Sequence, residues 1–161
     1  MDSQQQLKLD ELETSVDTVK NDELLYRCIF YGRNCYQVTG NTAKISSQAF
    51  SDRHQAPSMD RACLCNYDPK WTQKHEQNGV ISLIVVDIRM IDSVVQCDAK
   101  GNIICQHKID VHPRPTTDNI AHAQIEPSPE YQNKTTFRKL LERLAFLANQ
   151  REWEIKPYDL C

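Results

Sequence analysis

Glycine is scarce in this sequence, which has four glycines among its 161 residues. Walker-type phosphate loops, the dinucleotide-binding fingerprint and the Gly-x-Ser-x-Gly elbow of serine hydrolases all need glycines at fixed spacings. None of these motifs occurs in the chain. The sequence therefore excludes the commonest nucleotide hydrolases and serine hydrolases, and we expect no cofactor.

Long apolar runs and a strong charge imbalance are also lacking. No run approaches the ~18 to 20 apolar residues that span a bilayer, and the first six residues are polar, with no signal-peptide core. We therefore predict a cytoplasmic protein with no membrane partner. The net charge of −3 gives no general attraction to nucleic acid, so we do not expect nucleic acid as a partner.

Cysteine is present seven times, an odd number that fits reduced thiols better than a set of disulfides. No pair of cysteines has the spacing of a structural zinc finger, although Cys63-x-Cys65 and three histidines could in principle supply soft ligands. We predict no metal site. As nucleophiles, Cys63 and Cys105 lack a basic setting that would lower their pKa, so these thiols should be inert.

The composition is that of a folded domain, with 40% hydrophobic and 25% charged residues. Residues 1–23 form an acidic N-terminal arm that precedes a single domain at residues 24–161. In the arm, Leu9, Leu12, Val16 and Val19 recur at helical spacing, which predicts a helix over about residues 7–20. Two interpretations stay open, a mobile acidic arm with a weak helix, or a helix that docks on a partner.

The patterning of residues 24–161 predicts an α+β fold, a largely antiparallel sheet with a long C-terminal helix packed on it. The helix should follow its cap at Asn133 and bury the side of Phe137 and Leu144. Residues 80–88 are nearly all apolar and predict the central strand. Further strands are expected at 24–30 and 35–38, which form an opening hairpin, and at 61–65, 94–98, 102–107 and 121–125. Residues 44–50 are expected to form a short strand that passes into a turn, and residues 68–76 a short helix.

A loop rich in polar groups, at residues 110–126, follows an apolar strand and is where we place the candidate site. His112 and His122 are the candidate acid and base, because an imidazole exchanges protons most easily near neutral pH. Asn119 and Asp60 would orient the ligand. Each of these side chains lies near the end of an expected strand.

Arginines near other strand ends could clamp an anion, because a guanidinium binds oxyanions through two hydrogen bonds. Arg53 and Arg61 are the candidates, with Arg89 as a third. The simpler interpretation is that such arginines form surface ion pairs with neighbouring aspartates. For His122 the simpler interpretation is a half-buried histidine with a satisfied hydrogen bond.

Three segments, at residues 47–53, 58–61 and 118–123, carry the patterns Ser-x-x-Phe-x-Asp-Arg, Ser-x-Asp-Arg and Asn-x-Ala-His-Ala. Their order resembles that in a group of small uncharacterised bacterial proteins, over about residues 24–157. The resemblance implies one intact bacterial domain and no particular activity. More distantly, Tyr26-Arg27 followed by Ser46-Ser47 is similar to ADP-ribosyltransferase-like folds, whose last strand carries a glutamate where this chain has Gln124.

The leading hypothesis is a polar His/Arg/Asn pocket that binds a small anionic ligand, such as a nucleotide or phosphoester, and cleaves or transfers it. The alternative is a non-catalytic adaptor that docks on a larger protein, encoded nearby, through its N-terminal helix. The two hypotheses make different predictions. The pocket hypothesis requires His122, and the adaptor hypothesis requires the acidic arm at residues 1–23.

Overall fold

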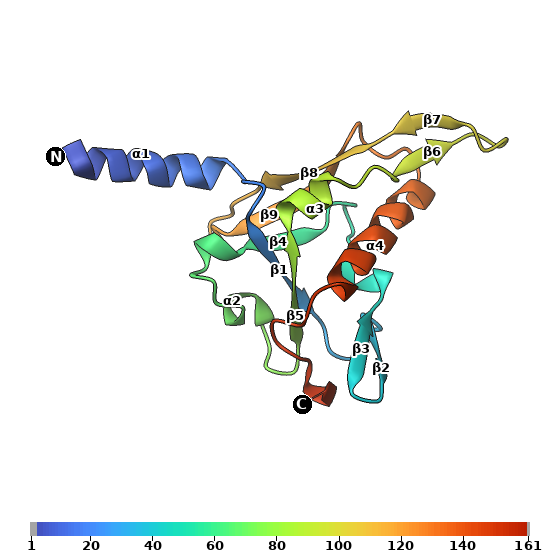
Figure 1. Cartoon of the computed structure of the whole chain (residues 1–161), viewed down its shortest axis with the longest axis horizontal. Coiled ribbons are helices and arrows are strands. Elements are labelled where there is room, and N and C mark those ends of the chain that lie inside the picture. Colours follow the sequence, from blue (N-terminus) through green and yellow to red (C-terminus); the bar gives the residue numbers. More distant parts are fainter. Residues whose placement is uncertain (1–2, 161) are drawn as a thin grey trace.

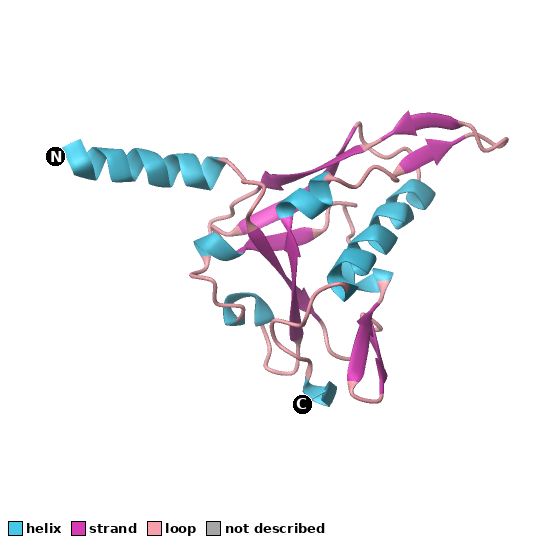
Figure 2. Ribbon diagram, viewed as in Figure 1, coloured by secondary structure: helices cyan, strands magenta, loops and turns pink. Residues whose placement is uncertain are grey.

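A five-stranded antiparallel sheet with the strand order β5-β1-β4-β9-β8 forms the centre of the molecule (Figures 1 and 2). The computed structural model describes residues 3–160, and between residues 9 and 15 it describes the backbone of a helix but no side chain. The strands are β1 (Leu24–Ile29), β2 (Tyr36–Thr39), β3 (Thr42–Ile45), β4 (Ser58–Arg61), β5 (Gly79–Ile84), β6 (Val95–Cys97), β7 (Ile103–Gln106), β8 (Lys108–Pro113) and β9 (His122–Ser128). The helices are α1 (Ser3–Asp17), α2 (Lys70–Gln73), α3 (Val85–Arg89) and α4 (Lys134–Asn149), with 3-10 turns η1 (Ser47–Phe50), η2 (Ala62–Leu64) and η3 (Tyr158–Leu160).

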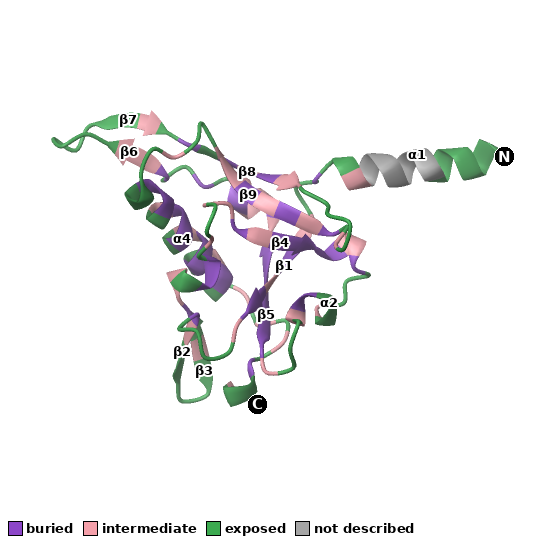
Figure 3. Ribbon diagram, turned by 180° about the vertical axis from the view of Figure 1, so that it is seen from behind, coloured by how far each residue is buried: buried purple, intermediate pink, exposed green. Residues whose placement is uncertain are grey.

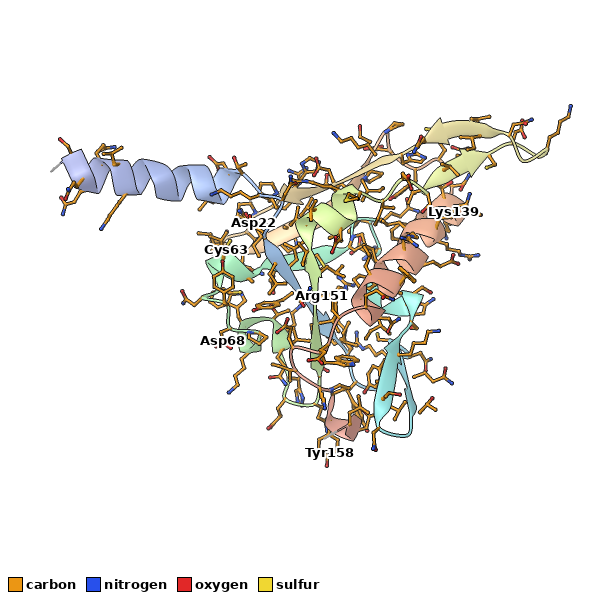
Figure 4. All side chains as sticks on the ribbon, in the orientation of Figure 1. Asp22, Cys63, Asp68, Lys139, Arg151 and Tyr158 are labelled. Carbon is orange, nitrogen blue, oxygen red and sulfur yellow. The ribbon has the colours of Figure 1, made fainter. Side chains whose placement is uncertain are left out.

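Helix α4 covers one face of the sheet and confirms the predicted C-terminal helix. Its cap is Asn133, whose side-chain oxygen accepts the Thr136 N–H. The inner side of α4 is buried (Figure 3), where Phe137 and Leu144 join the main core with alternate residues of β8 and β9. Lys139 Nζ donates to the Val95 carbonyl at 2.7 Å and ties the helix to β6 (Figure 4).

The opposite face of the sheet carries a smaller core around Tyr26, Ala62 and Val80, covered by η2 and the segment that follows it. Helix α2 begins after Asp68, whose carboxylate accepts the Lys70 N–H, and it ends at Gln73, earlier than the predicted residue 76. This second face holds the polar side chains of β4 and β9, because these alternate with residues that point into the main core.

Strand β5 is buried from Gly79 to Leu83, as its composition predicts, and partly buried at Ile84, but two parts of that prediction are wrong. The apolar run turns into helix α3 at Val85, so the strand ends at Ile84. Strand β5 also lies at the edge of the sheet rather than at its centre. It is buried because the C-terminal tail folds over it, with Ile155 bridging to Val80 and the Trp153 ring against Gly79.

The strand pairing near the N-terminus also differs from the prediction. Strand β1 pairs with β5 and β4, and the hairpin forms between β2 and β3 around Gly40. The strand predicted at 61–65 is β4, which ends at Arg61 and continues as the η2 turn. The hairpin of β6 and β7 around Gly101 is confirmed, with a positive φ of 85° at that glycine.

Helix α1 projects away from the rest of the molecule (Figure 1). It spans residues 3–17 rather than 7–20, and Leu9 and Leu12 of the predicted stripe lie outside the described side chains. Val19 follows the helix and is buried in the core. Within the described part of the chain, no helix is long and apolar enough to cross a bilayer.

Candidate functional site

A cleft opens on the second face of the sheet, where β1 and β4 separate. The two strands pair only at Leu25 with Arg61 and at Tyr26 with Asp60. Beyond these pairs the strands diverge and leave an open cavity of about 180 Å³, bordered by α2 and the loop before β9. Its lining residues are Tyr26, Arg27, Cys28, Phe30, Ser58, Met59, Asp60, Thr72, Lys74, Asn119 and His122.

Asp60 lies at the back of the cleft with both carboxylate oxygens occupied. Asn119 Nδ2 donates to Oδ1 at 2.8 Å, and the Thr72 hydroxyl donates to Oδ2 at 2.7 Å. Asn119 is itself held by the Ala121 N–H, which donates to its side-chain oxygen. These bonds join β4, α2 and the loop before β9, so Asp60 orders the walls of the cleft.

His122 and Ser58 form a hydroxyl–imidazole pair on the neighbouring strands β9 and β4. His122 Nδ1 lies 2.7 Å from the carbonyl oxygen of Arg114, which can only accept a hydrogen bond. Nδ1 therefore carries the proton, and in the neutral ring Nε2 accepts the hydroxyl of Ser58 at 3.1 Å. This is the geometry of a serine oriented toward a general base.

Two cations line the cleft. The Arg27 guanidinium donates to three carbonyl groups, at Ala49 (2.7 Å), Ser58 (2.6 Å) and Ser51 (3.3 Å). Burial lowers the pKa of Arg27, but an arginine stays charged in proteins. The second cation is Lys74, and together the two positive charges outnumber the one carboxylate of the cleft, at Asp60.

The backbone of Lys74 is held in a γ-turn with φ 62° and ψ −39°. The His75 N–H donates to the Gln73 carbonyl at 2.7 Å and closes this turn. A γ-turn with positive φ is rare and strained, above all for a residue with a side chain. Strain of this kind is found preferentially at binding and catalytic sites.

Three of the predicted site residues come together in this cleft, namely Asp60, Asn119 and His122. His112 lies on β8 opposite Gln124 and does not line the cleft. Because His122 is at a diagonal position on β9, the two imidazoles are not direct hydrogen-bond partners.

The two predicted arginine clamps lie elsewhere. Arg61 is buried and forms a bidentate ion pair with Glu23, at 2.7 and 2.8 Å. It also donates to the carbonyl groups of Val16 and Thr18, and thereby anchors the last turn of α1 and the segment that follows it. Arg53 is exposed and lines a separate groove beside α4.

Arg89, the third candidate clamp, is also a structural anchor. It pairs with Asp110 at 2.7 Å and donates to the Val19 carbonyl at 2.9 Å. Arg61 and Arg89 are thus used to hold the end of the acidic arm against the sheet.

Thiol chemistry has no support in this site. Cys28 lines the cleft, but its thiol donates to the Gln73 carbonyl and burial raises its pKa. Burial, followed by the charge of Glu23, likewise raises the pKa of Cys63. The six described cysteines are free, and among the described side chains, those of residues 3–8 and 16–160, no three His, Cys, Asp or Glu gather as metal ligands.

Sequence reasoning did not assign roles to Ser58, Thr72 or Lys74. The alternation of Ser58 and Asp60 along one strand could have placed both on one face. No sequence signal marks Lys74, because its γ-turn falls inside a segment with a helical pattern. Thr72 meets Asp60 only through the packing of α2 on the sheet.

Compared with protein-family models, with curated proteins and with solved structures, the chain shows no significant match. The resemblance to the bacterial group therefore stays a prediction. The chemistry of the cleft has to be inferred from its own residues.

Proposed function

We propose that the cleft between β1 and β4 binds a small anionic ligand, such as a nucleotide or another phosphoester, and cleaves or transfers its phosphoryl group. The observation that carries this proposal is the 3.1 Å contact between Ser58 Oγ and His122 Nε2, with the ring oriented by the Arg114 carbonyl. A hydroxyl becomes a useful nucleophile when an adjacent base accepts its proton.

The proposed reaction uses one nucleophile and one base. Ser58 Oγ bonds to phosphorus as its proton moves to His122 Nε2, and the bond from phosphorus to the leaving oxygen breaks. The proton on Nε2 then passes to that leaving oxygen. Water, activated by the same imidazole, hydrolyses the phosphoserine and regenerates the hydroxyl.

The charges of the cleft support an anionic ligand. The Lys74 ammonium lies 5.9 Å from the centre of the Phe30 ring, at the cleft, and Arg27 contributes a fixed positive charge through its bonds to three carbonyls. The Asp60 carboxylate oxygens accept hydrogen bonds from Asn119 and Thr72, and these donor dipoles weaken its repulsion of an anion.

Binding and turnover are tested separately with a panel of nucleoside phosphates and p-nitrophenyl phosphate. A ligand of the cleft should raise the melting temperature, by the equivalent of about 2.7 kcal/mol at 100 times its dissociation constant. The variant Lys74→Gln should lose this stabilisation. Ser58→Ala and His122→Gln should keep binding and lose phosphate release.

Matched controls are Ser93→Ala and His54→Gln, which make the same changes at exposed positions outside the cleft. Both should behave as the unaltered protein. The proposal fails if no compound of the panel stabilises the protein, or if Ser58→Ala and His122→Gln release phosphate as fast as the controls.

The adaptor hypothesis is supported by a different observation, the projection of α1 from the body (Figure 1). A helix of this length is marginally stable in water without packing, and Leu7 is 61% exposed. Docking on a larger protein would cover this helix. Deletion of residues 1–15 tests the hypothesis and leaves the Val16 and Thr18 carbonyls that Arg61 binds. The adaptor function is favoured if this deletion abolishes the biological effect while His122→Gln is silent.

A further inference from the structure

A second groove, of about 310 Å³, lies beside the first turns of α4 and is separate from the cleft of Ser58 and His122. One wall is a single face of α4, since its lining residues there are three, four and seven positions apart. The other wall is the end of η1 with the loop that follows it. The lining residues are Gln48, Ser51, Asp52, Arg53, Gln55, Lys134, Phe137, Arg138 and Leu141.

Three cations from two distant segments converge on this groove, namely Arg53 from the loop and Lys134 and Arg138 from α4. Among the side chains that the structure describes, none is an ion-pair partner of any of the three. The carboxylate among the lining residues is that of Asp52, and one of its oxygens accepts the backbone N–H groups of His54 and Ala56.

The position of these cations is electrostatically unfavourable without an anion. The N-terminus of an α-helix carries a partial positive charge of about half a unit, which favours acidic side chains in the first turn. Helix α4 has no acidic residue in its first turn and instead begins with Lys134, followed by Arg138 one turn later. Arg53 then adds a third positive charge from outside the helix.

We propose that this groove binds a doubly charged oxyanion, a phosphate or phosphomonoester group. The guanidinium groups of Arg53 and Arg138 would approach it from opposite walls, as bidentate donors suited to phosphoryl oxygens. The ammonium of Lys134 and the helix N-terminus supply further positive charge. The floor at Phe137 and Leu141 belongs to the buried core, so recognition comes from the polar rim.

The loop wall of the groove is ordered before any ligand arrives. Asp52 accepts two backbone N–H groups of its own loop, and the Gln55 N–H donates to the Asp52 carbonyl at 3.2 Å. Gln55 completes the turn with a φ of 60°. Arg53 is therefore presented from a fixed backbone, which reduces the ordering cost of binding.

Inorganic phosphate, titrated at constant ionic strength and followed by amide chemical shifts, tests the proposal. Phosphate should shift the amides of residues 52–55 and 134–138 saturably, and acetate, which carries one charge, should shift them less. Arg53→Gln, Lys134→Gln and Arg138→Gln should each weaken phosphate binding by about three- to tenfold. A phosphomonoester, glycerol phosphate, should compete for the same amides.

The matched control is Lys100→Gln, at the exposed tip of the β6–β7 hairpin. This substitution also removes one positive charge, but Lys100 does not line the groove. It should leave phosphate binding unchanged. The proposal is overturned if phosphate shifts none of these amides, or if Lys100→Gln weakens binding as much as Arg138→Gln does. Ser58→Ala should leave phosphate binding in the groove unchanged. A negative result for the groove can therefore be told apart from a negative result for the cleft.

Discussion

Replacing Arg61 with methionine tests the structural role that we assign to this arginine. Its side chain is 1% exposed and lies against the Glu23 carboxylate, which is 8% exposed. Arg61 donates two hydrogen bonds to that carboxylate and further bonds to the carbonyls of Val16 and Thr18. Methionine fills a similar volume but removes the donors to both Glu23 oxygens and to the two carbonyls, and of the donors to the Glu23 carboxylate it leaves the Lys20 N–H at 3.0 Å.

The expected loss of stability follows from the buried Glu23 charge, which Arg61→Met leaves without its ion-pair partner. Removing one partner of a buried ion pair costs about 3–5 kcal/mol, because the remaining charge is buried without compensation. In a domain of this size each kcal/mol lowers the melting temperature by about 2–4 °C. We therefore expect Arg61→Met to melt roughly 6–20 °C below the unaltered protein.

The pH dependence gives a second measurement. Burial by itself raises the pKa of Glu23, but hydrogen bonds from Arg61 and the Lys20 N–H and the charge of Arg61 outweigh it, so the pKa lies below its ordinary 4.5. A lowered folded-state pKa means that the stabilisation is complete above about pH 4.5 and is lost as the pH falls through the folded value. Arg61→Met should therefore lose less stability between pH 7 and pH 3 than the unaltered protein.

Urea unfolding followed by circular dichroism measures these free energies, with Arg53→Met as a control in which an exposed, unpaired arginine is replaced. The control should change stability by no more than about 0.5 kcal/mol. The double variant Glu23→Gln with Arg61→Met should be more stable than Arg61→Met alone, because the buried charge is gone. A loss below about 1 kcal/mol for Arg61→Met would refute the reasoning about an uncompensated charge.

Substitutions at three other positions have defined outcomes. Gly79→Ala would place a methyl group 2.5 Å from the Trp153 ring, so it should cost about 1–3 kcal/mol in urea unfolding and change the tryptophan fluorescence as the tail shifts. Asn133→Ala removes the acceptor of the Thr136 N–H and should cost about 1 kcal/mol, whereas Asn133→Asp, which keeps that acceptor, should cost less in the same assay. Lys74→Gly relieves the strained γ-turn and should raise the unfolding free energy by about 1 kcal/mol while abolishing anion binding in the cleft, and an unchanged or lower stability would contradict the strain.

The sequence alone determined the elements whose signals are local. The cap at Asn133 and the apolar face that follows it predicted α4, because a helix of this length needs one continuous buried stripe. Gly101 predicted the β6–β7 hairpin, since its turn requires a positive φ. The α+β class followed from these patterns together.

The tertiary structure decided what each element contacts. The apolar run of β5 could not show whether a neighbouring strand or the C-terminal tail covers its outer edge, because both bury the same side chains. A guanidinium binds a protein carboxylate in the same way as it binds an anionic ligand, so the sequence could not show which of the two Arg61 contacts. Only the tertiary fold brings the Glu23 carboxylate to Arg61. Ser58 and His122 are 64 positions apart, and their contact exists because β4 and β9 pair in one register.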